Sequence, residues 1–166
     1  MKGFEDLGVF AAFLAARALE VKLAARHGLR EGAALVREDA RSRIGTYQSA
    51  VGPFAGWAPL SEKTQLQRER LGFTPDDPLA RNLELHKHIT AGQEGDLAVV
   101  GVQFEQVGDG SKANPTRNIG YVAMEQELGG EWAPPRPFLG PAGFTQGEKV
   151  AHMIAQAVTL SLAGEK

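Results

Sequence analysis

The spacing of apolar residues predicts a helix at each end of the chain. Near the start they recur at alternating intervals of three and four, which lines one helical face: Phe4, Leu7, Ala11, Leu14, Ala18 and Val21. We expect this first helix to occupy residues 1–28, because Gly28 stands at a natural C-cap position. A second helix is expected over residues 31–44. The last helix is expected to start near Thr145, with Glu148 favourably placed in its first turn.

Between these ends the apolar spacing changes to that of strands. Alternating apolar residues over 83–104, interrupted by the turn "GQEGD", predict a β-hairpin. Short helices are expected between a Ser61 cap and Gly72, and over "IGYVAMEQELGG". The polar run at 106–118 predicts a flexible loop. The fold class is therefore α+β in a single domain, residues 1–166: a small antiparallel sheet with a central β-hairpin, packed by an N-terminal helical pair and a C-terminal helix.

Composition narrows the class of protein. Hydrophobic residues make up 43% and charged residues 23% of the 166 residues, which is ordinary for a globular domain. The net charge of −2 offers no global case for nucleic-acid binding. The chain has no cysteine, which excludes disulfides and thiolate metal sites. Its longest uncharged stretch near the start, residues 7–16, is too short to span a bilayer, so we expect no membrane partner and synthesis in the cytoplasm.

One histidine pair is the only candidate for metal chemistry. "HKH" would place His86 and His88 on one face of the predicted strand, with Glu84 on the same face. Such a set could serve a small metal-dependent enzyme, which is kept as the alternative, but the interpretation that we prefer is the solvent face of an amphipathic strand. No nucleophile elbow and no phosphate-binding loop of the required spacing occurs. The sequence therefore predicts no cofactor and a protein that is not an enzyme.

Basic residues give a second weak indication of a binding site, in this case for phosphate groups. Two helical segments carry arginines that could touch phosphate: Arg37, Arg41, Arg43, Arg68 and Arg70. Acidic neighbours, among them Glu38 and Asp39, dilute both groups. Any phosphate contact would be loose and not base-specific.

The stretch "GGEWAPPRPFLGPAGF", residues 129–144, is the most unusual in the chain. Its prolines restrict the backbone before any binding, so little entropy remains to be lost on docking. Its aromatic and arginine side chains are of types enriched in binding hot spots. The candidate docking residues are Trp132, Pro135, Arg136, Pro137, Phe138, Leu139 and Phe144. The alternative is that Phe138 packs the last helix onto the sheet, and the sequence leaves both open.

Three stretches together resemble one protein family. They are "GWAPLSEKTQLQRERLG", "DPLARNLELHKHITAGQEGDLAVVGV" and "GYVAMEQELGGEWAPPRPFLGPA", within residues 31–160. They are similar to the tail-completion and tail-terminator neck proteins of tailed bacteriophages, whose motifs match here at Trp57, Pro59 and Leu60, and most specifically at "RPFLGPA", residues 136–142.

The resemblance implies a structural virion protein at the head–tail junction. Its members are expected to form a ring, most often a hexamer, that terminates or completes the tail and joins it to the head connector. The implied partners are further copies of the chain, the tail-tube protein and a connector or stopper protein, with at most non-specific contact with packaged DNA. The implied location is the neck of the virion, after assembly in the host cytoplasm. Another neck component, such as a stopper or connector adaptor, is the alternative.

Overall fold

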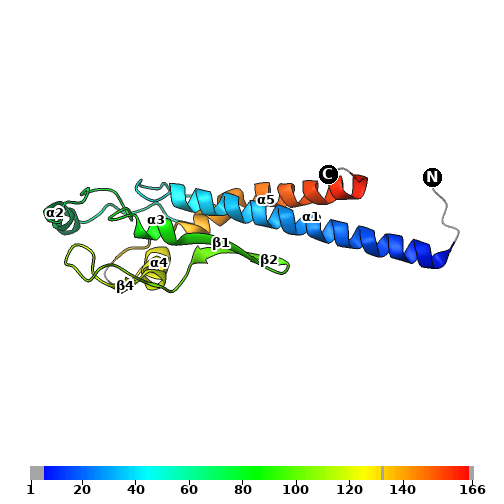
Figure 1. Cartoon of the computed structure of the whole chain (residues 1–166). Coiled ribbons are helices and arrows are strands. Elements are labelled where there is room, and N and C mark those ends of the chain that lie inside the picture. Colours follow the sequence, from blue (N-terminus) through cyan, green and yellow to red (C-terminus); the bar gives the residue numbers. More distant parts are fainter. Residues whose placement is uncertain (1–5, 132, 165–166) are drawn as a thin grey trace.

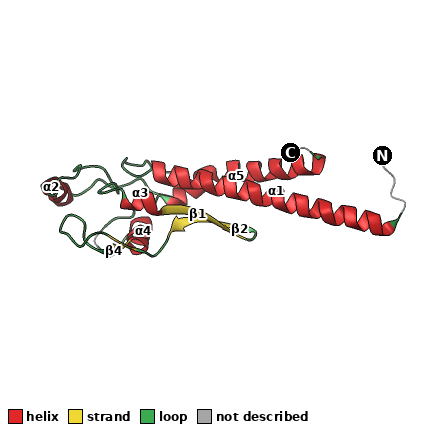
Figure 2. Ribbon diagram, in the orientation of Figure 1, coloured by secondary structure: helices red, strands yellow, loops and turns green. Residues whose placement is uncertain are grey.

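The computed structural model describes residues 6–131 and 133–164. It confirms the α+β class: two small antiparallel sheets are packed by helices (Figures 1 and 2). The elements in chain order are α1 (Leu7–Ser42), α2 (Glu62–Arg70), α3 (Glu84–His88), β1 (Ile89–Glu94), β2 (Leu97–Val102), β3 (Gln106–Val107), β4 (Arg117–Asn118), α4 (Ile119–Leu128) and α5 (Leu139–Ala163).

The first two predicted helices are a single helix. α1 runs unbroken through Gly28, so the predicted C-cap there, and with it the N-terminal helical pair, is wrong. A glycine inside a helix costs only about 1 kcal/mol relative to alanine, which packing can offset. Here the packing partner is α5, which lies alongside α1 (Figure 1). A Cβ at Gly28 would lie 2.9 Å from the Ile154 Cα, and one at Gly32 would lie 2.6 Å from the Val150 Cγ1. Both glycines therefore allow the two helices to approach closely.

Replacement of Gly28 by valine is expected to lower the free energy of unfolding by about 1–3 kcal/mol, because the new side chain meets the α5 backbone. Gly147→Ala is the matched control: Gly147 is helical too, but nothing lies within 4 Å of its Cβ position. That variant should gain about 0.5–1 kcal/mol from helix propensity. Urea denaturation measures both, and equal effects in the two variants would contradict the close packing.

The predicted β-hairpin is present but shorter than expected. β1 pairs with β2 in antiparallel register, from Ile89 opposite Val102 to Glu94 opposite Leu97. Its turn is held against α1, because Arg26 Nε donates to Asp96 Oδ1 at 2.8 Å. The expectation that the first strand starts at Leu83 is wrong, since residues 84–88 form α3. Leu85, in α3, and Ile89, the first residue of β1, are still both buried in the core.

The polar run at 106–118 closes a second hairpin rather than forming only a loop. β3 pairs with β4 through Gln106 opposite Asn118 and Val107 opposite Arg117. Asn118 then caps α4, accepting hydrogen bonds from the backbone N–H groups of Gly120 and Tyr121. This confirms the predicted helix there, and α2 likewise begins at the predicted Ser61 cap.

The core is concentrated where α3, α4 and the start of α5 meet the C-terminal part of α1. Its largest fully buried side chains are Phe138, Ile89, Ile119 and Pro78. Trp57, Ala40 and Ala142 join the same cluster. The molecule is consequently uneven in thickness, with a packed body at one end and the α1–α5 helical pair extending from it (Figure 1).

Candidate functional site

The predicted docking segment is tied into the body by three sets of polar contacts. The first joins it to residues 57–59. Trp57 Nε1 donates to the Pro137 carbonyl at 3.0 Å. The Arg136 guanidinium donates back to the Ala58 carbonyl, at 3.1 Å from Nη2, and to that of Pro59 at 3.4 Å. Burial disfavours the charged form and lowers the pKa of Arg136 from its usual value.

The second set fixes the start of α5. The Glu127 carboxylate accepts from the backbone N–H groups of Phe138, Leu139 and Gly140, at 2.8, 3.0 and 2.7 Å. These are N–H groups that a helix start leaves without an intrahelical partner. α5 accordingly begins at Leu139, six residues before the predicted start, and Glu148 does not lie in its first turn as predicted.

The third contact is a backbone bond between the segment and α4, from the Arg136 N–H to the Gln126 carbonyl. Arg136 is 5% exposed and Phe138 is fully buried. Pro137 is buried as well. In the described structure these three side chains lie inside the body rather than on its surface, which does not fit a docking surface. The question left open for Phe138 is answered as core, because it belongs to the buried cluster that contains Trp57.

The remaining members of the predicted docking set are distributed differently. Phe144 is 58% exposed on α5, Pro135 is exposed, and Leu139 is half-buried. Phe144 also packs edge-to-face on Phe54, with ring centroids 6.4 Å apart. Trp132 lies outside the described residues. Among the described members of the set, Phe144 and Pro135 are the exposed ones.

The three candidate metal ligands do not form one set, although His88 Nδ1 lies 3.6 Å from Glu84 Oε2. In α3, His86 and His88 are two positions apart on a helix, so they point to different sides, and the predicted shared strand face is wrong. His88 Nδ1 lies 2.7 Å from the Glu84 carbonyl, one turn back in the same helix. Over residues 6–131 and 133–164, no group of three His, Asp or Glu side chains is arranged to hold a metal ion. The alternative of a metal-dependent enzyme loses its geometric basis.

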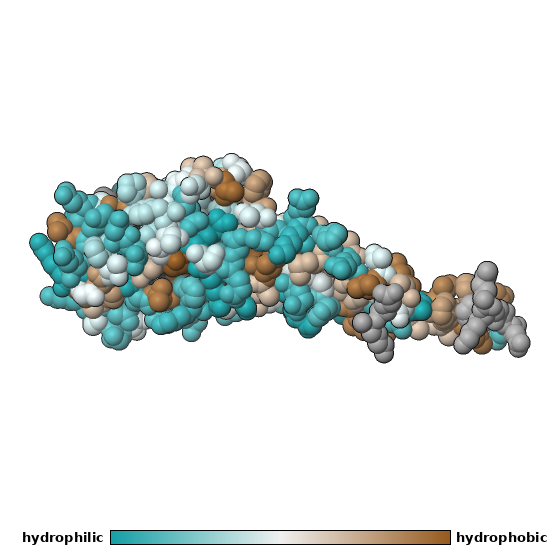
Figure 3. All heavy atoms as spheres, turned by 90° about the horizontal axis from the view of Figure 1, so that it is seen from above, coloured by the Kyte–Doolittle hydropathy of each residue, from teal (hydrophilic) through white to brown (hydrophobic). Residues whose placement is uncertain are grey.

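A long apolar surface covers the free end of the α1–α5 pair. We call it the arm surface, and it consists of residues of both helices that are 40% exposed or more: Leu7, Val9, Phe13, Leu14, Leu19, Leu23, Leu160 and Leu162. The space-filling view shows hydrophobic atoms along this narrow part of the molecule (Figure 3). The final turn of α5 reaches only to Arg17, so the first turns of α1 project beyond it (Figure 1). Among the described helices, none is long and apolar enough to cross a membrane.

A cavity of about 490 Å³ opens at the other end of the molecule, between α2, α3, α4 and the 133–136 segment. Four arginines contribute to its wall: Arg68, Arg81, Arg117 and Arg136. We call this cavity the arginine pocket. In the described part of the chain, none of the four forms an ion pair with a carboxylate. Apolar residues such as Leu60, Leu79 and Val122 complete the wall.

Burial and neighbouring charges both act on the arginines of the pocket. Burial lowers the pKa of Arg68 from its usual value, and the neighbouring charge of Arg81 lowers it further, whereas Asp77 raises it. Burial also lowers the pKa of Arg81, and the charge of Arg117 adds to that effect. Since guanidinium groups stay protonated in proteins, the pocket has a positive field, which the carboxylate of Asp77 offsets in part at Arg68.

Sequence patterns did not reveal this pocket. In the sequence, Arg68 belongs to a cluster of arginines with acidic neighbours, and Arg136 belongs to the predicted docking segment. Arg81 and Arg117 lie in segments without a basic pattern. Only the fold brings the four together, from α2, the 79–82 turn, β4 and the segment before α5. No local sequence pattern predicts the pocket, because the four arginines are far apart along the chain.

No protein-family profile, no curated protein and no solved structure matches the chain. What the fold defines is an α+β protein with a projecting helical arm and an arginine-lined pocket.

Proposed function

We propose that this chain is a structural virion protein of the phage head–tail junction, a ring-forming component that terminates or completes the tail and joins it to the head connector. The exposed arm surface is the observation that carries the proposal. It supports self-association, and the three stretches that resemble neck proteins supply the setting in which a ring of this kind would work.

The arm surface has exposed apolar residues on opposite sides of α1. Leu7 and Leu14 are seven positions apart and share one side of α1, whereas Val9 and Leu23 lie on the opposite side. All four are at least 50% exposed. A helix that is apolar on every side is normally buried, so a single neighbour on one side would leave apolar area in water. A ring satisfies this requirement, because each copy has a neighbour on either side.

The total surface of the chain supports the same conclusion. It exposes 10775 Å², whereas a compact monomer of this length exposes about 8,000 Å². The excess of about 2,800 Å² falls within the range of areas buried in obligate complexes. The chain thus has the surface of a subunit that is incomplete alone.

The segment with the strongest resemblance has a structural part in this proposal. Residues 136–142 form the junction between residues 57–59, α4 and α5, as the contacts of Trp57, Glu127 and Arg136 show. They determine where α5 begins and hence how it lies along α1. A subunit would use this segment to hold its arm in position rather than to touch the partner.

The arm surface gives a direct test of self-association. The double variant Leu14→Glu/Leu23→Glu should weaken association about 100-fold, because two apolar contacts worth about 1.5 kcal/mol or more each are lost at every interface. Its folded subunit should persist, since both side chains are at least half exposed. Sedimentation velocity measures the change.

Leu66→Glu is the matched control for that variant. Leu66 is 48% exposed, which is close to the exposure of Leu14 and Leu23. It lies on α2, however, at the far end of the molecule from the arm (Figure 1). It should leave the assembly unchanged. Equal dissociation in the control and the double variant would contradict the role of the arm surface.

The place in the virion is tested genetically. Disruption of the gene for this chain in its virus should give filled heads and complete-looking tails that do not join, as seen by negative-stain electron microscopy. Supplying the wild-type chain in trans should restore joined particles. Normal joined particles without the chain would refute the proposed neck function, and particles lacking a tail-tube would favour another morphogenetic role.

A further inference from the structure

We propose that the arginine pocket binds a short acidic peptide segment of a partner protein, with a carboxylate held by Arg81 and Arg117 and apolar side chains against the leucine-lined wall. This inference stands on the pocket alone and does not depend on ring formation or on a place in a virion.

Unsatisfied donors are the first reason. The Nε of Arg81 is buried without a hydrogen-bond partner in the described part of the chain. Its Nη2 donates to the Ala113 carbonyl, and its guanidinium lies 5.2 Å from the centre of the Phe73 ring, so the group is held in place. Arg117 donates one long bond, 3.4 Å to Asn82 Oδ1, which leaves most of its N–H groups without a described acceptor. A guanidinium held in place, with a second one beside it that has N–H groups to spare, suits a carboxylate.

The four positive charges are the second reason. Arg68 and Arg136 are 8% and 5% exposed, and both donate hydrogen bonds to backbone carbonyls rather than to carboxylates. Buried charges are normally paired, since an unpaired one costs several kcal/mol in lost solvation. An anionic ligand would supply the missing negative charge.

The shape and chemistry of the wall favour a peptide among anions. A volume of about 490 Å³ is within the range of sites for drug-sized ligands, which is far more than one inorganic ion requires. Leu60, Leu79 and Val122 offer apolar contact that a phosphate ion cannot use. Among the described residues that line the pocket, none is aromatic, whereas single-stranded nucleic acids are usually held by stacking on aromatic rings. A segment that alternates acidic and apolar side chains matches both parts of the wall.

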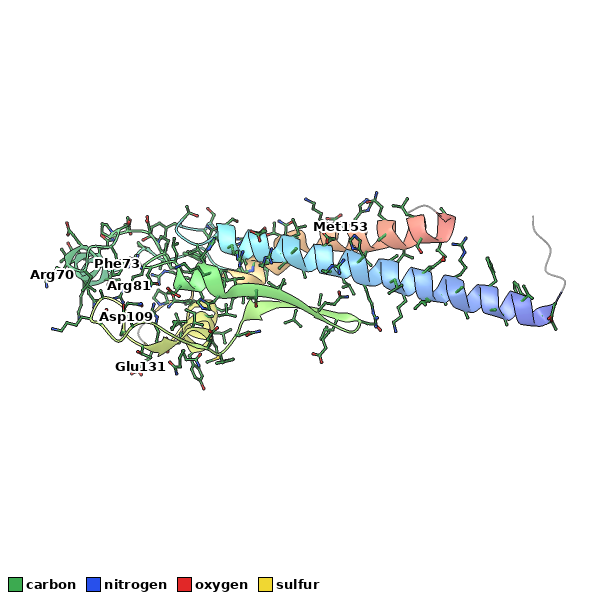
Figure 4. All side chains as sticks on the ribbon, in the orientation of Figure 1. Arg70, Phe73, Arg81, Asp109, Glu131 and Met153 are labelled. Carbon is green, nitrogen blue, oxygen red and sulfur yellow. The ribbon has the colours of Figure 1, made fainter. Side chains whose placement is uncertain are left out.

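The side-chain view places the test residues. Arg81 lies between α2 and α4, while Arg70 lies on α2 at the outer end of the molecule (Figure 4). Arg70 is exposed and is not among the residues that line the pocket. Arg70→Gln therefore removes the same charge from the same region and serves as the matched control for substitutions inside the pocket.

Isothermal titration calorimetry on the full chain tests the proposal. The probe is a peptide with blocked ends and the sequence leucine, aspartate, leucine, glutamate, leucine. It should bind with one site per chain, and its asparagine and glutamine counterpart should not. Arg117→Gln should weaken binding about 10- to 100-fold, as expected for a lost charge-assisted hydrogen bond. Arg70→Gln should bind as the wild type does.

Several outcomes would overturn the proposal. They are equal affinity for the acidic and neutral peptides, equal affinity of the Arg117→Gln and Arg70→Gln proteins, and no binding of the acidic peptide. Tighter binding of inorganic phosphate or of a single-stranded oligonucleotide than of the peptide would also overturn it. The comparison of acidic with neutral peptide uses only wild-type protein, so the test holds even if a pocket variant fails to fold.

Discussion

Phe138→Ala is expected to lower the free energy of unfolding by about 3–5 kcal/mol, the range for removing a buried aromatic side chain. Phe138 is fully buried and belongs to the same cluster as Trp57, Ile89 and Ile119. It also stands immediately before α5, so the cavity left behind would loosen the helix start as well as the core. Chemical denaturation monitored by tryptophan fluorescence and circular dichroism measures the loss.

Phe144→Ala is the control that separates core from surface. Phe144 comes from the same segment and is the same residue type, but it is 58% exposed and packs on Phe54 and over Gly52. Its removal should cost about 1 kcal/mol, the scale of one aromatic pair. If Phe138→Ala were as mild as Phe144→Ala, the segment would not be part of the core, and a docking role for Phe138 would have to be considered again.

Glu127→Ala is expected to cost about 2–4 kcal/mol, because three backbone N–H groups at the start of α5 lose their acceptor. The carboxylate also lies at the positive end of the helix dipole, which adds to its contribution. Glu127→Gln keeps one acceptor oxygen and should fall between the wild type and the alanine variant. Urea denaturation gives the free energies, and amide hydrogen exchange at residues 138–140 should show faster exchange in the alanine variant.

Glu125→Ala is the matched control on the same helix. Glu125 is exposed, and no hydrogen bond or ion pair of its side chain is present in the described structure. Its replacement should change stability by less than about 0.5 kcal/mol, as is usual at such surface positions. A loss in the control comparable with that of Glu127→Ala would mean that charge on α4, rather than capping of α5, determines stability.

The sequence predicts the regular elements where local signals are strong. Ser61, a capping residue followed by helix formers, marks α2, and the turn signal at 92–96 marks the β1–β2 hairpin. Prediction from the sequence fails where contact with a segment far away in the chain determines the local structure. Gly28 has the local signature of a helix end, yet it lies inside α1 because α5 packs on it. Leu83, Leu85 and Ile89 alternate as in a strand, yet the segment before Ile89 is helical.

The environment of the predicted docking segment also depends on contacts with residues elsewhere in the chain. Arginine and phenylalanine in a proline-rich segment are typical of a docking loop when the segment is considered alone. Glu127, eleven residues before Phe138, reverses that interpretation by capping α5, and no local pattern announces the contact. The arm surface could be anticipated from the apolar residues near the N-terminus, but its exposure could not, since exposure depends on where α5 ends.

The mass of the purified chain in solution is the most direct test of ring formation. Sedimentation equilibrium or native mass spectrometry should give a closed oligomer, with a hexamer expected from the family resemblance, and ring-shaped particles should appear in electron micrographs. Leu14→Glu/Leu23→Glu should run as a folded monomer, and Leu66→Glu should match the wild type. A wild-type chain that remains a folded monomer at its highest soluble concentration would contradict the account, because its arm surface would then need no partner copy.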